Sequence, residues 1–213
     1  MDAANRASYP KTGTDAFNTI DTSNTGSLKN GLQYVPDRHG GSFEWDGSDD
    51  YIILNEKFFP QTYTSFTYCA FVEFFSVAAS SQIINDRDGS GDGFSFLMSK
   101  PSGAKLYASL NSGNVVGSTA LSINQVYHAS ITYDGQTAKI YLDGVEDGSS
   151  ETSQTFNTTT NPTIGVRSFN IGSASVARMY LYHICSYNRA LSAAEVLHNY
   201  NALKSRFGLW VEE

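Results

Sequence analysis

The segment YHASITYDGQTAKIYLDGVEDG, residues 127–148, decides the fold class. Apolar residues alternate with polar ones on both sides of Asp134-Gly135, and a second Asp-Gly pair follows at Asp143-Gly144. Asp-Gly between alternating strands is a strong hairpin signal, because both residues tolerate positive φ. Two such turns one strand apart predict a three-stranded antiparallel meander. The residues expected to face the core are Ala129, Ile131, Tyr133, Ala138, Ile140 and Leu142.

Short extended runs separated by turn residues continue on both sides of this meander. The aromatic-rich run YTSFTYCAFVEFF (63–75) predicts a central strand that is covered on both faces. The run GSFEWDGSDDYIIL (41–54) predicts a strand, an Asp-Gly turn and a second strand. The runs SQIIN (81–85) and GFSFLM (93–98) predict a hairpin around an acidic loop. The chain is therefore predicted to be all-β.

One helix is predicted, at about residues 192–207. Ser192 and Glu195 have the spacing of a capping box, in which each side chain bonds a free backbone N–H group. Gly208 suits the end of the helix. We expect its single apolar stripe to pack onto the strands. The stripe consists of Val196, Tyr200, Leu203 and Phe207.

Composition limits the partners of the protein. The 213 residues, 40% of them hydrophobic, suit a single domain spanning 1–213 with one core. The net charge of −7 and the lack of clustered basic residues argue against nucleic acid. No apolar run approaches the ~20 residues that cross a bilayer, and MDAANRASYPKTG (1–13) lacks the apolar stretch of a secretory signal. Cys69 and Cys185 form no zinc pattern, and spacing leaves open whether they are bonded.

The acidic loop IINDRDGSGDGFSFLM (83–98) carries Asp86, Asp88 and Asp92 at a spacing similar to that of calcium ligands. A helix–loop–helix calcium site needs a glutamate at the twelfth loop position, where this chain has Leu97. The loop also opens into a strand, so it offers no helix N-terminus to a phosphate. We expect an exposed hairpin tip whose three carboxylates are splayed into water and share no ion.

Together these segments resemble the laminin G-like jelly rolls of the concanavalin A-like lectin/glucanase superfamily, over about Asp2 to Gly208. The resemblance implies an antiparallel β-sandwich with one short C-terminal helix and no required cofactor. It implies calcium as a possible ligand, with Asp46, Asp49 and Asp50 as candidates. These aspartates can equally be turn formers that bond their own backbone. Besides the meander, the matching segments are MDAANRASYPKTGT (1–14), GSFEWDGSDDYI (41–52, as a first hairpin), SFTYCAFVEF (65–74) and YNRALSAAEV (187–196).

The sequence does not favour catalysis, although the superfamily includes glucanases. Retaining glycosidases need two carboxyl groups about 5 Å apart, which the glucanases of this superfamily carry as an E-x-D-x-E string that is missing here. Glu73 is the one carboxylate within an aromatic strand, and it can be paired, edge-facing or catalytic. His39, His128, His183 and His198 are scattered, without the spacing of a ligand pair. We therefore expect no enzyme.

Aromatic side chains that face outward are the candidate ligand-binding residues. In VARMYLYHICSY (176–187), Met179 and Leu181 are expected inside, which places Arg178, Tyr180 and Tyr182 on the opposite face. In AKLYASLNSG (104–113), the inward set Leu106, Ala108 and Leu110 leaves Tyr107 outside. Sugars bind through aromatic faces and polar side chains. The same tyrosines could instead form a subunit contact or the seat of the C-terminal helix.

Two functions follow from the resemblance. The first is a non-enzymatic structural protein of a virus particle, such as a bacteriophage capsid-decoration or tail protein, with a lectin-like sandwich that can bind host-surface carbohydrate. Its partners would be other virion proteins or further copies of itself. The alternative is a secreted or surface carbohydrate-binding or adhesion module of a cellular organism. Both place the protein in a virion or outside the cell.

Overall fold

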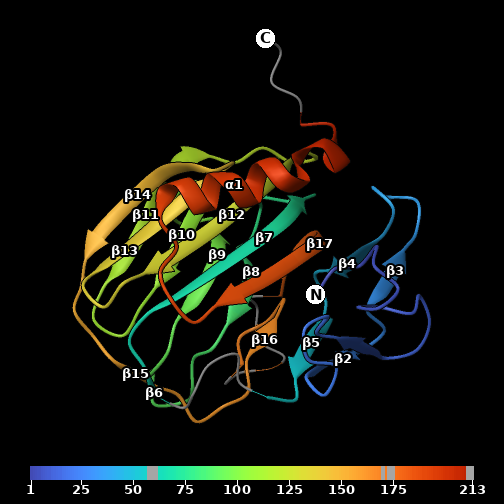
Figure 1. Cartoon of the computed structure of the whole chain (residues 1–213), viewed down its shortest axis with the longest axis horizontal. Coiled ribbons are helices and arrows are strands. Elements are labelled where there is room, and N and C mark those ends of the chain that lie inside the picture. Colours follow the sequence, from blue (N-terminus) through green and yellow to red (C-terminus); the bar gives the residue numbers. More distant parts are fainter. Residues whose placement is uncertain (57–61, 169–170, 172–175, 210–213) are drawn as a thin grey trace.

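Two large antiparallel sheets face each other across one core in the computed structural model (Figure 1), which describes residues 1–56, 62–168, 171 and 176–209. The all-β sandwich with a short C-terminal helix is thus confirmed. The eight-stranded sheet has the order β1 (Asp15–Phe17), β2 (Thr25–Lys29), β5 (Tyr51–Leu54), β16 (Thr163–Ile164), β8 (Ser81–Asn85), β9 (Ser95–Ser99), β10 (Lys105–Ser109), β11 (Asn114–Ala120). The seven-stranded sheet has the order β14 (Val145–Glu151), β13 (Thr137–Leu142), β12 (Val126–Tyr133), β7 (Phe66–Phe74), β17 (Arg178–Tyr187), β4 (Ser42–Asp46), β3 (Gln33–Val35). A small pair joins β6 (Thr62–Tyr63) to β15 (Phe156–Asn157).

The predicted meander is present as β12, β13 and β14, which are neighbours in the seven-stranded sheet. Asp143 and Gly144 have φ of 51° and 82°, so the second Asp-Gly turn uses the positive φ that favours this pair. Ile131 lies opposite Ile140 in the register, as the alternation requires. Of the predicted inward residues of the meander, Leu142 is partly buried and the other five are buried.

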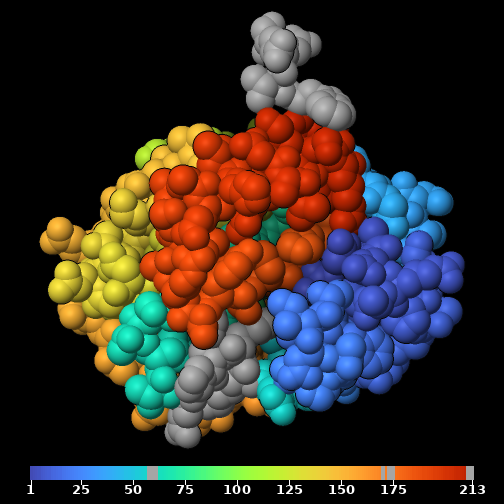
Figure 2. Space-filling view, in the orientation of Figure 1, coloured from blue at the N-terminus to red at the C-terminus, as the bar shows by residue number. Residues whose placement is uncertain are grey.

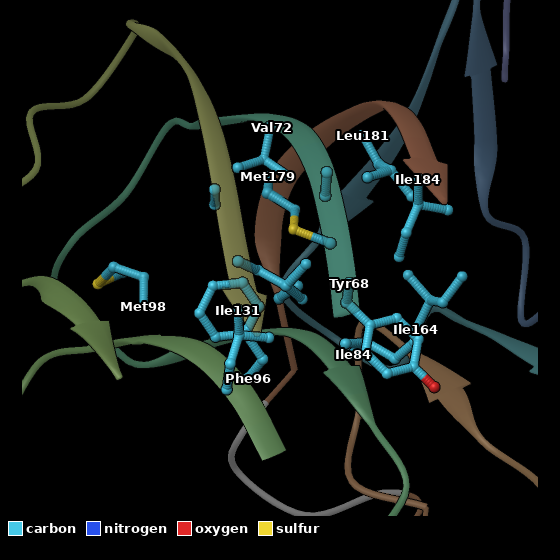
Figure 3. Packing of buried hydrophobic residues seen from close by; sticks show 14 of the residues in the cluster. Tyr68, Val72, Ile84, Phe96, Met98, Ile131, Ile164, Met179, Leu181 and Ile184 are labelled. Carbon is cyan, nitrogen blue, oxygen red and sulfur yellow. The ribbon is translucent and has the colours of Figure 1, made fainter. Parts of the chain in front are cut away.

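The core lies between the inner faces of the two sheets. Figure 3 shows Met179 and Leu181 of the seven-stranded sheet pointing toward Ile84 and Phe96 of the eight-stranded sheet. Both Met179 and Leu181 are buried, as predicted for the inward positions of their strand. The inward set predicted for the run 104–113, Leu106, Ala108 and Leu110, is buried as well.

All nine residues of β7 are buried, so both faces of this central strand are covered, as predicted. Its inner face contributes to the core, and its outer face lies beneath α1 (Ala193–Leu203) and the short 3₁₀ helix η1 (Lys204–Phe207). The ring of Phe207 stacks on that of Phe71 with 4.6 Å between centroids. Figure 2 shows this C-terminal segment, in red, across the upper middle of this face of the molecule.

The ends of the helix confirm the predicted signals. Ser192 is the N-cap and accepts a hydrogen bond from the backbone N–H of Glu195, whose carboxylate accepts from the backbone N–H of Ser192 in return. Gly208 ends η1 with φ of 69°, in the left-handed region that glycine adopts freely. No helix in the described part of the chain is long and apolar enough to span a membrane.

The hairpin expected in residues 41–54 is wrong. The strands on either side of the Asp46-Gly47 turn lie in different sheets, because β4 pairs with β3 and β17, whereas β5 pairs with β2 and β16. Both edges of β4 are occupied, which leaves no edge for β5. The turn therefore carries the chain from one sheet to the other.

Cys69 and Cys185 lie directly opposite each other on the neighbouring strands β7 and β17. Both are free thiols. Residues opposite each other in antiparallel strands have Cα atoms about 4.5–5.5 Å apart, which is within the range that a disulfide spans. The structure thus shows that the two cysteines are neighbours, which their spacing in the sequence left open.

His128 gives the helix-covered face a dependence on pH. Its ring lies 4.7 Å from that of Phe71 and 5.9 Å from that of Tyr200. Burial, with a smaller contribution from His183, lowers the pKa of His128 to about 3. The unfolded chain binds this proton near pH 6.5, so the stability contribution is full above that pH and is lost as the pH falls. We expect His128 to reduce the free energy of unfolding by up to about 1.4 kcal/mol per pH unit between about pH 6 and pH 4.

Urea unfolding at several pH values across this window measures the effect. His128→Phe should flatten the pH dependence, whereas His198→Gln, at an exposed position on α1, should leave it as it is. Equal slopes in the native protein and in His128→Phe would contradict the assignment.

Candidate functional site

The four candidate ligand-binding residues lie on opposite outer faces of the sandwich. Tyr107 is on β10 of the eight-stranded sheet, whereas Arg178, Tyr180 and Tyr182 are on β17 of the seven-stranded sheet. They do not form one site. The side chain of Arg178 lies over Gly47 in the turn that follows β4.

Tyr182 is fully buried, so the expectation of an exposed ring is wrong at this position. Its ring lies 5.2 Å from that of Phe207, and its hydroxyl donates to Oε2 of Glu73. Burial and the Glu73 carboxylate raise the pKa of Tyr182. Tyr182 therefore forms part of the seat of the C-terminal helix, which is one of the roles that the sequence allowed for these tyrosines.

Glu73 is a paired residue. Nη1 of Arg38 is 2.9 Å from both carboxylate oxygens of Glu73. The guanidinium of Arg38 also lies over the ring of Tyr180, 3.9 Å from the centroid. Tyr180 is half-buried under this arginine and donates to Oε1 of Glu44 at 3.2 Å. This cluster joins neighbouring strands and offers no open aromatic row.

The turn Asp46–Asp50 is arranged around its own backbone. Oδ1 of Asp46 accepts from the N–H of Ser48 at 2.7 Å, and Oδ2 of Asp50 accepts from the N–H of Asp46 at 3.3 Å. Burial raises the pKa of Asp50. In the described ranges, no three His, Cys, Asp or Glu side chains converge as metal ligands would. Asp46 and Asp50 thus have the turn-forming role that the sequence left open, and calcium at this turn stays a prediction.

The acidic loop joins β8 to β9 as a hairpin with Gly89 and Ser90 exposed at its tip, as predicted, but two of its three carboxylates are not splayed into water. Asp86 and Asp88 are buried. Oδ2 of Asp86 accepts from the hydroxyl of Tyr63 at 2.9 Å. Oδ1 of Asp88 accepts from Ser90 and from the N–H of Asp92. Hydrogen bonds, first that of the Ser90 hydroxyl, lower the pKa of Asp88. Asp86 and Asp88 thus bond different protein groups, and these hydrogen bonds shape the loop.

A groove of about 540 Å³ lies over the outer face of the eight-stranded sheet, on the opposite side of the sandwich from α1. Its floor contains one cross-strand row, in which Gln82 of β8 lies opposite Leu97 of β9 and Leu97 lies opposite Tyr107 of β10. The acidic loop (87–91) forms part of the lining. Serines add hydroxyl groups around the row: Ser80, Ser95, Ser99, Ser102 and Ser109. This volume is typical of small-ligand sites.

Gln82 is the most informative residue of the groove. Its side chain has no exposed surface, and within the described residues neither Oε1 nor Nε2 has a hydrogen-bond partner. A buried polar group without a partner costs about 1–3 kcal/mol. An amide at the floor of a groove can recover that cost by bonding a ligand, because it offers a donor and an acceptor side by side.

The sequence singled out Tyr107 but missed Gln82, Arg87 and Arg167, which also line the groove. Gln82 stands at an outward position of a strand, and the outward positions of β9 are Ser95, Leu97 and Ser99. Small polar residues at alternate positions of adjacent strands were the signal that could have indicated a polar groove.

A second cavity, of about 340 Å³, lies beside the C-terminal half of β17. Ile164, Ile184 and the largely exposed Ile20 contribute to its lining. Burial lowers the pKa of His183, which also lines it, to about 4, so this imidazole is neutral at physiological pH. The groove is the better candidate because polar groups of several strands converge in it.

The chain matches the model of a known protein family. A family model described as the concanavalin A-like lectin/glucanases superfamily matches residues 46–197. The chain belongs to this superfamily. A comparison with curated protein sequences finds no match.

Solved structures share the fold of this concanavalin A-like protein. The binding domain of Paraclostridial Mosquitocidal Protein 1 has a TM-score of 0.72 at 14% identity, over 90% of this chain and 50% of that chain. Trypanosoma rangeli sialidase in complex with sialic acid has a TM-score of 0.70 at 15% identity, over 96% and 33%. The binding domain of botulinum neurotoxin serotype D has a TM-score of 0.65 at 15% identity, over 84% and 46%. The chain spans half or less of each, and identities this low show the fold alone.

Because Tyr182 is covered and Tyr107 lies on an open face, their substitutions should lower the free energy of unfolding by different amounts. Tyr182→Ala opens a cavity beneath Phe207 and should lower the free energy of unfolding by about 3 kcal/mol or more. Tyr107→Ala removes a half-buried ring from the open face and should cost less than about 1 kcal/mol. Chemical denaturation of both variants measures the difference. Equal losses would contradict the placement of Tyr107 on an open face.

The acidic loop predicts that Asp86, Asp88 and Asp92 share no calcium ion. Thermal melting with calcium or with a chelator tests this, because an ion that binds the folded state raises the midpoint. If calcium raises the midpoint at all, we expect the rise to persist in Asp88→Ala and to be lost in Asp49→Ala. A rise that disappears in Asp88→Ala would show that the loop holds the ion.

Proposed function

We propose that the protein is a non-catalytic module that binds carbohydrate in the groove over β8, β9 and β10. The observation that carries this proposal is the buried amide of Gln82, whose donor and acceptor suit a pair of sugar hydroxyls. The ring of Tyr107 supplies an apolar face for sugar C–H groups, and the surrounding serines supply further hydroxyl contacts.

The carboxylates of the protein support binding without hydrolysis. Asp88 is the one carboxylate among the described residues that line the groove, and its oxygens are engaged by Ser90, Asp92 and Thr159. Glycosidases of the common type need a pair of carboxyl groups on either side of the scissile bond. Glu73 lies on the other sheet and is held by Arg38.

For the biological setting of this function, we propose a virus particle. The protein would act as a bacteriophage capsid-decoration or tail protein that binds host-surface carbohydrate, with other virion proteins or further copies of itself as partners. The opposite placement of groove and helix supports this, because one face can pack in an assembly while the other stays open. A secreted or surface adhesion module is the alternative. Antibody labelling of purified virus particles separates the two.

Glycan-array binding followed by titration calorimetry tests the groove. Gln82→Leu should reduce affinity for any glycan bound by about tenfold or more, since the amide bonds are lost while the fold is kept. Tyr107→Ala should act likewise, and Tyr107→Phe should retain most binding.

Gln136→Leu is the matched control, because Gln136 is exposed in the first turn of the meander. Glycan binding that survives both Gln82→Leu and Tyr107→Ala would contradict the site. Release of new reducing ends from a bound glycan would contradict the non-catalytic role.

A further inference from the structure

Arg87 is a fixed guanidinium in the lining of the groove. Its Nε donates to the carbonyl of Gly91 at 3.0 Å, and its Nη1 donates to Oγ of Ser109 on β10 at 2.6 Å. An arginine side chain has five N–H groups, and the described residues accept from two of those of Arg87. The others remain available on a side chain whose orientation is already set, so little conformational entropy is lost when they bind.

The segment that carries Arg167 is tied to that of Arg87 by one buried residue, Asn85. Oδ1 of Asn85 accepts from the N–H of Arg87 at 3.1 Å and from the N–H of Ser168 at 3.1 Å. The hydroxyl of Ser168 also donates to the carbonyl oxygen of Arg87. Two segments separated by about eighty residues of sequence are thus tied together, and both of their arginines line the groove. Arg167 is exposed, and no described residue forms an ion pair with it.

The charge of the groove is opposite to that of the whole chain. The protein carries a net charge of −7, yet the charged side chains that line the groove in the described ranges are two arginines and Asp88. The Asp88 carboxylate is engaged by Ser90 and Asp92 of its own loop and by Thr159. The groove therefore presents uncommitted positive charge beside the neutral amide of Gln82.

We propose that the groove selects acidic sugars, and that Arg87 and Arg167 hold a carboxylate or sulfate group of the glycan. This inference rests on the proposed carbohydrate-binding function and adds the chemical class of the ligand. Planar guanidinium groups bind such anions through paired charge-assisted hydrogen bonds, which a neutral sugar cannot form. Gln82 and Tyr107 then bind the ring that carries the anionic group.

Calorimetric titration with matched pairs of glycans tests the proposal. The probes are sialyllactose against lactose, an oligogalacturonate against its methyl ester, and a sulfated chondroitin oligosaccharide against the unsulfated one. The native protein should bind the acidic member of at least one pair about tenfold more tightly, and less so at high ionic strength. The pairs that respond identify carboxylate or sulfate as the anionic group.

Arg167→Gln should remove most of this preference by lowering the affinity for the acidic member toward that for the neutral one. Arg87→Gln should do the same, with thermal melting to verify its fold. Arg6→Gln, an equal charge change at an exposed residue before the first strand, should keep the preference.

The outcomes separate the two proposals. Equal binding of acidic and neutral members, abolished in both cases by Gln82→Leu, would overturn the anionic selectivity and leave the carbohydrate site intact. An acidic preference that survives Arg167→Gln and Arg87→Gln would also overturn it. Binding of neither member of any pair, and of no glycan on the array, would overturn both proposals.

Discussion

Burial of both faces of β7 is the constraint on which the rest of the structure depends. The inner face of this strand belongs to the core, and its outer face carries Phe71, which must be removed from water by something other than a sheet. The C-terminal segment does this through Phe207. The helix occupies that face of the sandwich, and the groove lies on the other side, over the outer face of the eight-stranded sheet. Packing of the C-terminal segment thus closes one outer face, and the candidate site lies on the other.

Local sequence patterns predicted the elements well, because their causes are local. Alternation places Ile131 and Ile140 inside, and the capping box at Ser192 starts the helix where expected. The connection between β4 and β5 could not be predicted in this way. Its Asp-Gly turn is typical of a hairpin, but the pairing of β4 depends on β3 and β17, and β17 is more than one hundred residues away in the sequence.

The candidate site was only partly predictable, for a similar reason. Alternation correctly placed Tyr107 outside, but it placed Tyr182 outside too, and only the packing of Phe207 shows that this ring is covered. The two arginines line the same groove because Asn85 bonds the backbone of both of their segments, and a contact over such a sequence distance leaves no local pattern. The acidic loop, which suggested a metal site by its spacing, contributes Arg87 instead of a carboxylate cage.

The proposed function depends on ligand binding at the floor of the groove, at Gln82. Solution NMR of ¹⁵N-labelled protein, titrated with a glycan selected on an array, observes the side-chain NH₂ signals of this residue directly. We predict that the side-chain signals of Gln82 shift. The backbone amide signals of β8, β9 and β10 should shift over the same range of ligand concentration. Shifts confined to β17 and the helix, with Gln82 unchanged, would show that ligand binds elsewhere than in the groove.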